Sequence, residues 1–141
     1  MCMTYTPDIG PRPQKPHGSP SSLPWTDGVL VRATNWLGDA LMTLPAVYRL
    51  SRLLPEGACF AVLCPAGLEP LWRSTPWVTE GIGFTGRRLD SKCKEKVARL
   101  NHGVTVVLPN SFGSAWDLWR AGSPRRIGRG GRFRGRLLNN A

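Results

Sequence analysis

The feature that most constrains the fold is a regular alternation of short apolar runs with longer segments of helical periodicity. The apolar runs occupy residues 28–33, 58–64, 78–84, 104–108 and 126–128. The helical segments occupy residues 39–54, 68–74, 89–100 and 112–121. Because strands and helices alternate, we expect an α/β fold with a doubly wound, mostly parallel sheet in the strand order 3-2-1-4-5. The first run is apolar at successive positions, as in a central strand covered on both faces.

The first helix shows an apolar stripe at spacings of three and four residues, formed by Leu37, Leu41, Leu44 and Tyr48. This spacing predicts the face that packs on the sheet. Pro45 lies inside the same segment and predicts a kink or a second helix start. Glycines interrupt the third apolar run, which we therefore place near a sheet edge.

The composition suits one globular core. The chain has 141 residues, 41% of them hydrophobic, so a single domain of roughly 100 to 150 residues is expected. Residues 1–26 are rich in proline among Gly, Ser and Thr and predict a disordered extension, so that the folded domain spans residues 27–141. No signal-peptide core or run of about 18 apolar residues is present, so we expect a cytoplasmic protein.

Cysteine and histidine provide no metal-binding pattern. The four cysteines contain no Cys-x-x-Cys pair and are expected to be unpaired, buried side chains. They are Cys2, Cys59, Cys64 and Cys93. The two histidines, His17 and His102, fall in the N-terminal extension and in a turn, without a catalytic setting. We therefore expect no metal and no cofactor.

Two loops of the expected sheet are candidates for a ligand site. In doubly wound sheets ligands bind at the carboxyl ends of the strands, near the point where the strand order reverses. The loop 34–39 follows the first strand, and the loop 109–111 follows the fourth. In the expected strand order these two loops are neighbours.

The residues leave two interpretations of Asp39 open. As an N-cap of the first helix its carboxylate would bind free backbone amides, which is worth about 1 kcal/mol. As a general base it would take a proton from a substrate hydroxyl, which is worth roughly 10²- to 10⁴-fold in rate. Gly38 allows close backbone approach, by an anion or by the helix itself. Trp36 is either packed on the core or a stacking platform for a sugar, and the spacing favours core packing.

The formal charge of +10 is concentrated near the C-terminus, where no acidic residue follows Asp117. The arginines of this segment are Arg125, Arg126, Arg129, Arg132, Arg134 and Arg136. They are interleaved with glycine, so a flexible, solvated tail is one interpretation. The others are capture of substrate phosphates or contact with nucleic acid or anionic lipid. Phe133 is the one aromatic residue among them, which gives base stacking little support.

Two blocks of sequence resemble a known family. Residues 30–45 read LVRATNWLGDALMTLP, and residues 107–112 and 121–128 read VLPNSF and AGSPRRIG. Both blocks resemble the ADP-heptose:lipopolysaccharide heptosyltransferases of glycosyltransferase family 9, in particular the heptosyltransferase II members. The resemblance covers roughly residues 28–140.

The resemblance implies an inverting, metal-independent glycosyltransferase built from two Rossmann-like domains, the GT-B architecture. Such an enzyme transfers heptose from ADP-heptose to the lipopolysaccharide inner core at the cytoplasmic side of the inner membrane. This chain then corresponds to the N-terminal, acceptor-binding half, with the donor-binding domain absent or in a separate chain. By the same resemblance Asp39 is the general base. The implied acceptor-binding residues are Asn35, Trp36, Gly38, Asn110, Ser111, Arg125 and Arg126.

Two other functions remain open at the level of sequence. One is a catalytically inactive remnant that binds the acceptor or an anionic membrane. The other is a nucleic-acid-binding protein, which the lack of a recognisable DNA- or RNA-binding motif disfavours. We therefore expect lipopolysaccharide core and ADP-heptose as partners, peripheral membrane contact, and no nucleic acid.

Overall fold

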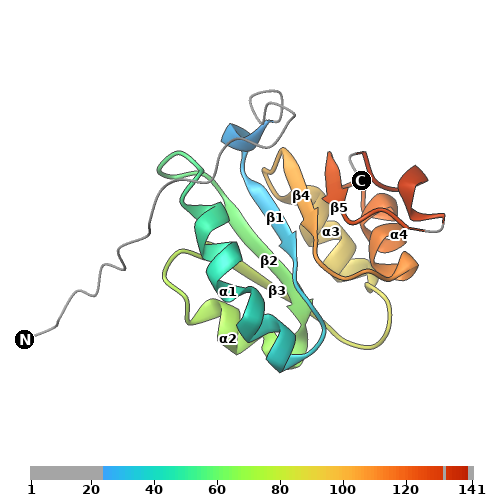
Figure 1. Ribbon diagram of the computed structural model, residues 1–141, viewed down its shortest axis with the longest axis horizontal. Coiled ribbons are helices and arrows are strands. Elements are labelled where there is room, and N and C mark those ends of the chain that lie inside the picture. The colour runs from blue at the N-terminus through green and yellow to red at the C-terminus, as the bar shows by residue number, and fades with distance from the viewer. Residues whose placement is uncertain (1–23, 132, 140–141) are drawn as a thin grey trace, which may run out of the picture.

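The computed structural model describes residues 24–131 and 133–139 as a single α/β unit (Figure 1). The strands are β1 (Val29–Arg32), β2 (Phe60–Pro65), β3 (Glu80–Phe84), β4 (Val104–Val107) and β5 (Arg126–Gly128). The helices are α1 (Leu37–Ser51), α2 (Glu69–Arg73), α3 (Ser91–Arg99) and α4 (Phe112–Arg120). Short 3₁₀ turns span Trp25–Asp27, Ala66–Leu68 and Arg134–Arg136. The extension predicted for residues 1–26 lies outside the described residues up to residue 23.

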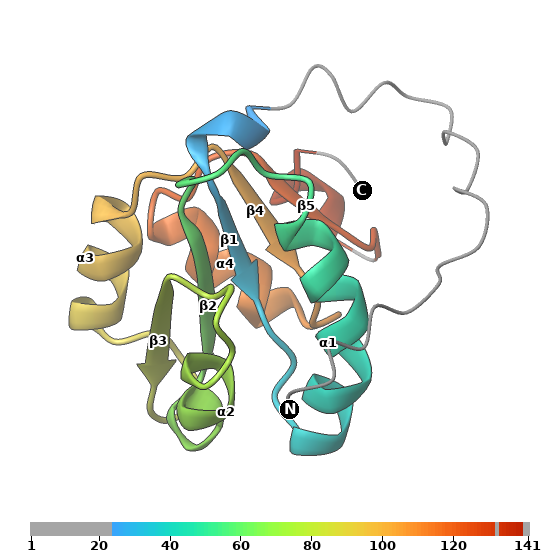
Figure 2. The same cartoon turned by 90° about the vertical axis from the view of Figure 1, so that its left-hand side faces the viewer.

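The five strands form one parallel sheet in the order β3-β2-β1-β4-β5, which confirms the predicted topology. Figure 2 shows the arrows of β1 to β4 pointing toward the same end of the sheet. The strand with two glycines, β3, is an edge strand, as predicted. β1 lies between β2 and β4. The sheet grows from β1 to β3 in one direction and from β1 to β5 in the other, so the strand order reverses at β1.

Apolar side chains of β1 point alternately into two cores. Val29 and Val31 pack with Ala40, Val47 and Trp72, on the face covered by α1 and α2. Leu30 is part of the other core, which includes side chains of α3, α4 and the segment after β5. All four residues of β1 are buried, so the prediction of a strand covered on both faces is confirmed.

The face of α1 that packs on the sheet differs from the predicted one. Ala40 and Val47 are buried, whereas Leu37, Leu41 and Tyr48 are 42–55% exposed. Leu44, the remaining residue of the predicted stripe, does pack on this core with Ala40 and Val47, so the prediction holds for Leu44 alone. The helix also runs without interruption through Pro45, so the predicted second start is wrong.

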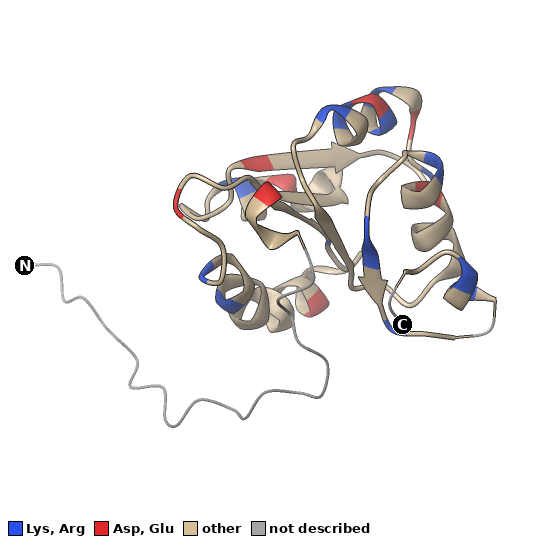
Figure 3. Cartoon of the chain, turned by 90° about the horizontal axis from the view of Figure 1, so that it is seen from above, with Lys and Arg blue, Asp and Glu red and all other residues tan. Residues whose placement is uncertain are grey.

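The arginine-rich segment is not a fully solvated tail. Leu137 and Leu138 are buried in the core beside α4. The backbone N–H of Asn139 donates to the carbonyl of Arg126 at 2.8 Å, and the Asn139 side chain accepts from the Arg126 N–H at 2.7 Å. Arg134 is only 3% exposed. Figure 3 shows the basic segments around the described C-terminal end.

His102 is not a solvent-exposed turn residue but a buried one. Its Nε2 lies 3.2 Å from the Ser123 hydroxyl, which also pairs with Thr105, and its Nδ1 lies 3.1 Å from the Leu100 carbonyl. Burial lowers the pKa of His102. Cys64 and Cys93 are also buried and Cys59 is partly buried, all three unpaired, while Cys2 lies outside the described residues.

Gly28 precedes β1 in a conformation that only glycine adopts easily, with φ 98° and ψ 168°. A Cβ atom there would lie 2.7 Å from the Asn101 carbonyl and 2.8 Å from the Cys59 carbonyl. We expect Gly28→Ala to lower the free energy of unfolding by about 3 kcal/mol or more in urea titration. Gly57→Ala is the control, because its φ is also positive (81°) but its Cβ would meet open space. Equal losses in the two variants would contradict this account.

Acid should weaken the fold through His102. Because its pKa is lowered in the folded state, the unfolded chain takes up the proton first as the pH falls. The stabilisation is present above the unfolded pKa of about 6.5 and is lost as the pH falls toward the folded pKa. Urea titrations between about pH 7 and 5 should therefore show a shallower pH dependence for His102→Gln than for the wild type.

Candidate active site

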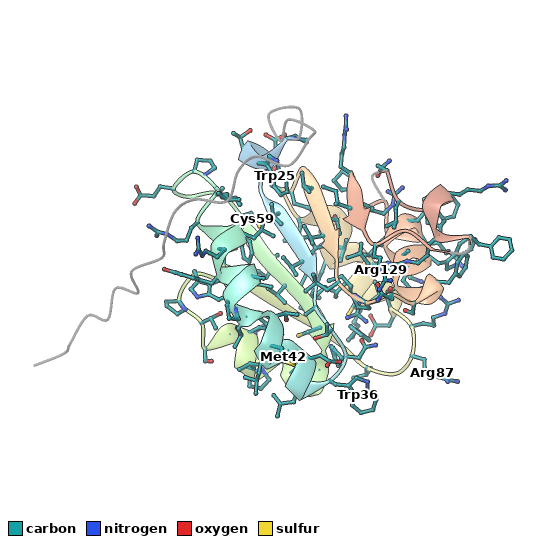
Figure 4. The ribbon with its side chains drawn as sticks, viewed as in Figure 1. Trp25, Trp36, Met42, Cys59, Arg87 and Arg129 are labelled. Carbon is teal, nitrogen blue, oxygen red and sulfur yellow. The ribbon has the colours of Figure 1, made fainter. Side chains whose placement is uncertain are left out.

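The two loops predicted to be neighbours meet at the carboxyl end of the sheet. They line a pocket of 270 Å³ whose residues are Thr34, Asn35, Trp36, Asp39, Leu108, Pro109, Asn110 and Ser111. The backbone N–H of Leu108 donates to the Arg32 carbonyl at 3.1 Å, which ties the end of β4 to β1. Figure 4 shows Trp36 and Arg87 at this end of the molecule and Trp25 and Cys59 at the opposite end. The structure therefore brings together five of the predicted site residues, Asn35, Trp36, Asp39, Asn110 and Ser111.

Asp39 is not the N-cap of α1. The helix begins at Leu37, and the N-cap is Trp36, which provides no side-chain hydrogen bond. Asp39 is thus the third residue of the helix, and it is exposed. No donor within the described residues bonds its carboxylate. The carboxylate lies in the first turn of α1, near the positive end of the helix dipole, and its exposure leaves it open to a ligand.

Trp36 and Gly38 both face solvent. Trp36 is 74% exposed, so the prediction that it packs on the core is wrong. A Cβ on Gly38 would meet no atom within 4 Å outside its neighbours and the backbone of its own helix, so no other described element packs closely against this glycine. Both positions leave room for a ligand beside Asp39.

The second loop is held in place by hydrogen bonds from two sides. Ser111 caps α4, with its hydroxyl accepting from the Ser114 backbone N–H at 3.3 Å. Arg134 donates through Nη2 to the Pro109 carbonyl at 2.8 Å. Across the pocket, the Thr34 hydroxyl is buried and has no hydrogen-bond partner among the described residues.

A second, larger pocket of 660 Å³ adjoins the first and shares Asn35, Trp36 and Ser111 with it. Its inner wall includes Arg32, the last residue of β1, which is 6% exposed. Burial lowers the pKa of this guanidinium to about 10, still well above neutrality. Sequence reasoning missed Arg32, although a charged residue at the end of an apolar strand was a usable signal.

Arg125 and Arg126, which were also predicted to bind the acceptor, lie outside the site. Arg126 pairs with Thr105 near the start of β4, whereas the site is at the carboxyl ends of the strands. Its Nε donates to the Leu137 carbonyl at 2.6 Å, and its Nη1 donates to the Ser123 carbonyl. Neither arginine lines either pocket at the site.

The described residues offer no metal centre and no membrane-spanning helix. Among residues 24–131 and 133–139, no group of three or more His, Cys, Asp or Glu side chains could hold a metal ion. In the same part of the chain, no helix has the length and apolar character needed to cross a membrane.

The topology and the pocket at the sheet reversal define a doubly wound α/β domain with a Rossmann-like ligand site. No protein-family model matches the chain. It is similar to lipopolysaccharide heptosyltransferase 2 of Salmonella typhimurium and of Escherichia coli, at 33% identity over 80% and 79% of its length. A solved structure of E. coli ADP-heptose lipopolysaccharide heptosyltransferase II matches 79% of the chain, with a TM-score of 0.65 and 34% identity.

These relatives are considerably longer than this chain. The match covers 34% of each curated relative and 33% of the solved chain. The chain thus spans about a third of the length of the heptosyltransferases it matches. The comparisons support the predicted resemblance and the predicted fold.

The position of Asp39 predicts a small role in stability. Because its side chain makes no cap bond, Asp39→Ala should remove only the helix-dipole interaction, about 0.3–1 kcal/mol or less. Asp90→Ala is the matched comparison, because Asp90 caps α3 by accepting from the Cys93 N–H at 2.7 Å. That variant should lose more stability in urea titration, because it also removes a cap hydrogen bond. A larger loss for Asp39→Ala than for Asp90→Ala would mean that Asp39 is mainly structural.

Proposed function

We propose that this chain is the acceptor-binding part of a heptosyltransferase, which transfers heptose from ADP-heptose to the lipopolysaccharide inner core. The observation that carries the proposal is its similarity in sequence and in structure to lipopolysaccharide heptosyltransferase 2. The exposed carboxylate of Asp39 at the reversal point of the sheet supports it, because this is where doubly wound proteins bind ligands.

In this proposal Asp39 is the general base. Its carboxylate takes the proton from the acceptor hydroxyl as that oxygen attacks the anomeric carbon of the donor. The ADP leaves from the opposite face of the sugar, so the configuration is inverted. Asn35, Trp36, Asn110 and Ser111 line the pocket around the acceptor, and Gly38 leaves space for it. No metal is required for these steps.

The donor is held, in this proposal, by a further domain in the same or a separate polypeptide. The pocket that contains Asp39 is an open depression formed by two loops of one domain. Transfer requires donor and acceptor to be held at near-contact distance, which requires a donor-binding surface facing this pocket. We therefore expect the described domain alone to bind acceptor without efficient transfer.

Peripheral contact with the cytoplasmic face of a membrane belongs to the same proposal. Phe112 and Trp119 on α4 are each 47% exposed, and Phe133 is 77% exposed within the arginine-rich segment. Exposed aromatic side chains together with arginines are typical of surfaces that bind anionic lipid headgroups. Such contact would bring the site to a lipid-linked acceptor.

A chimera tests the proposal directly. Residues 24–141 replace the matching third of the E. coli enzyme, and heptose transfer from ADP-heptose to heptose-deficient lipopolysaccharide is measured. We expect turnover by the chimera, and a fall in kcat of about 10²- to 10⁴-fold for Asp39→Asn.

The control variant is Asp27→Asn, because Asp27 is an exposed carboxylate in the turn before β1, away from the site. It should leave kcat unchanged. Wild-type turnover by a folded Asp39→Asn chimera would rule out the base role. A folded chimera that binds acceptor but transfers no heptose would instead support an acceptor-binding protein without activity.

A further inference from the structure

Arg32 is a buried charge without a carboxylate at salt-bridge distance among the described residues, and unlike Arg134, which is similarly buried and also unpaired there, it lines a pocket at the site. Arg32 is 6% exposed, and none of the salt bridges in the described part of the chain includes it. Burying an unpaired charge is costly, so such a group is normally compensated by an opposite charge. Within residues 24–131 and 133–139 no carboxylate lies at salt-bridge distance from Arg32, and Asp117, which lines the same pocket, attracts it from farther away.

The nearby acidic groups are already engaged or neutral. Asp117 accepts from the Arg88 guanidinium at 3.3 Å and from the Leu89 N–H at 3.4 Å. Glu69 pairs with Arg73 at 2.7 Å. Burial raises the pKa of the Cys64 thiol to about 12, so this neighbour of Arg32 is uncharged at neutral pH.

The guanidinium of Arg32 is nevertheless held in a defined position. Its Nη2 donates to Asn35 Oδ1 at 2.7 Å, and its Nη1 donates to the Ala33 carbonyl. Its Cζ lies 4.6 Å from the centre of the Phe84 ring. A guanidinium fixed in this way loses little conformational freedom when it binds an anion.

The pocket in front of Arg32 suits an anionic group of a ligand. Its 660 Å³ volume is within the usual range for small-molecule sites, and its rim includes the exposed Arg87. The Ser111 and Ser114 side chains add hydroxyl groups to its wall. Because this pocket shares Asn35, Trp36 and Ser111 with the Asp39 pocket, one ligand can occupy both.

We propose that Arg32 binds a carboxylate or phosphate group of the acceptor whose reacting hydroxyl faces Asp39. The guanidinium keeps further N–H donors for such a group beside its bonds to Ala33 and Asn35, and the anion supplies an opposite charge at contact distance, which no described carboxylate does. The part of the proposal that concerns Asp39 rests on the proposed function, whereas anion binding at Arg32 does not. Arg32 acts here as a binding residue that selects acceptors with an anionic substituent.

The test measures binding of three simple probes to the full chain by calorimetry. The probes are glucuronate, glucose 6-phosphate and uncharged glucose, so that the carboxylate and phosphate arms are separated. We expect Arg32→Met to weaken binding of at least one anionic probe tenfold or more and to leave glucose unchanged. Arg32→Lys keeps the charge without the paired donors and should give an intermediate loss.

Arg125→Gln is the matched control, because it removes an exposed arginine that lines neither pocket. It should bind all probes like the wild type. Equal weakening by Arg125→Gln and Arg32→Met would show general charge attraction instead of a site. Unchanged anion binding by Arg32→Met would overturn the proposal.

Thermal unfolding separates anion binding from a purely structural role of Arg32. If Arg32 binds an anion, phosphate should raise the Tm of the wild type but not the Tm of Arg32→Met. Without anion, Arg32→Met should be at least as stable as the wild type, because it removes a buried charge. If Arg32→Met has a lower Tm than the wild type and phosphate still raises that Tm, the role of Arg32 is only to stabilise the loop after β1. If the folded chimera neither binds the acceptor nor transfers heptose while Arg32 still binds anions, the proposed function fails and anion binding at Arg32 stands.

Discussion

The parallel pairing of β1 with both β2 and β4 is the constraint on which the rest of the structure depends. Because β1 has a neighbour on each side, its residues are buried in two cores and its carboxyl end lies at the point where the chain order reverses. The helices that follow β1 and β4 leave this edge on opposite faces of the sheet. Their first turns therefore border an opening that no side chain of the sheet can fill.

The electrostatics of this opening follow from the same arrangement. The N-terminal turn of α1 carries Asp39 at the positive end of a helix dipole, so an exposed carboxylate is favourable there. The last residue of β1 carries a positive charge into a buried position on the other side of the Asn35 side chain. One short connection thus places the Asp39 carboxylate and the Arg32 guanidinium in adjacent pockets. This pairing suits a substrate with both a hydroxyl and an acidic group.

Sequence reasoning predicted the fold more completely than the site. The strand order, the edge position of β3 and the meeting of the 34–39 and 109–111 loops follow from apolar runs and connection rules, which act locally or through simple topology. It failed for Trp36 and for three of the four apolar residues expected to face the sheet from α1, because hydrophobicity alone does not reveal which side chains the sheet covers. It also placed Arg125 and Arg126 at the site, although they lie near the start of the β4–β5 pair. The inward arginine of the last segment is Arg134, whose contact with Pro109 spans 25 positions of sequence.

The amino-acid sequence by itself determined the class of fold, the position of the reversal point and the carboxylate that stands there. These depend on the period of apolar residues and on the glycine and proline positions, which can be read along the chain. The tertiary structure alone decided that Asp39 makes no cap bond, that Trp36 is exposed and that Arg32 is buried without a carboxylate partner among the described residues. The reason is that burial and charge compensation are properties of neighbours in space. The residues that share the pocket with Arg32 come from four separate stretches of the chain, residues 35–36, 65, 84–89 and 111–117.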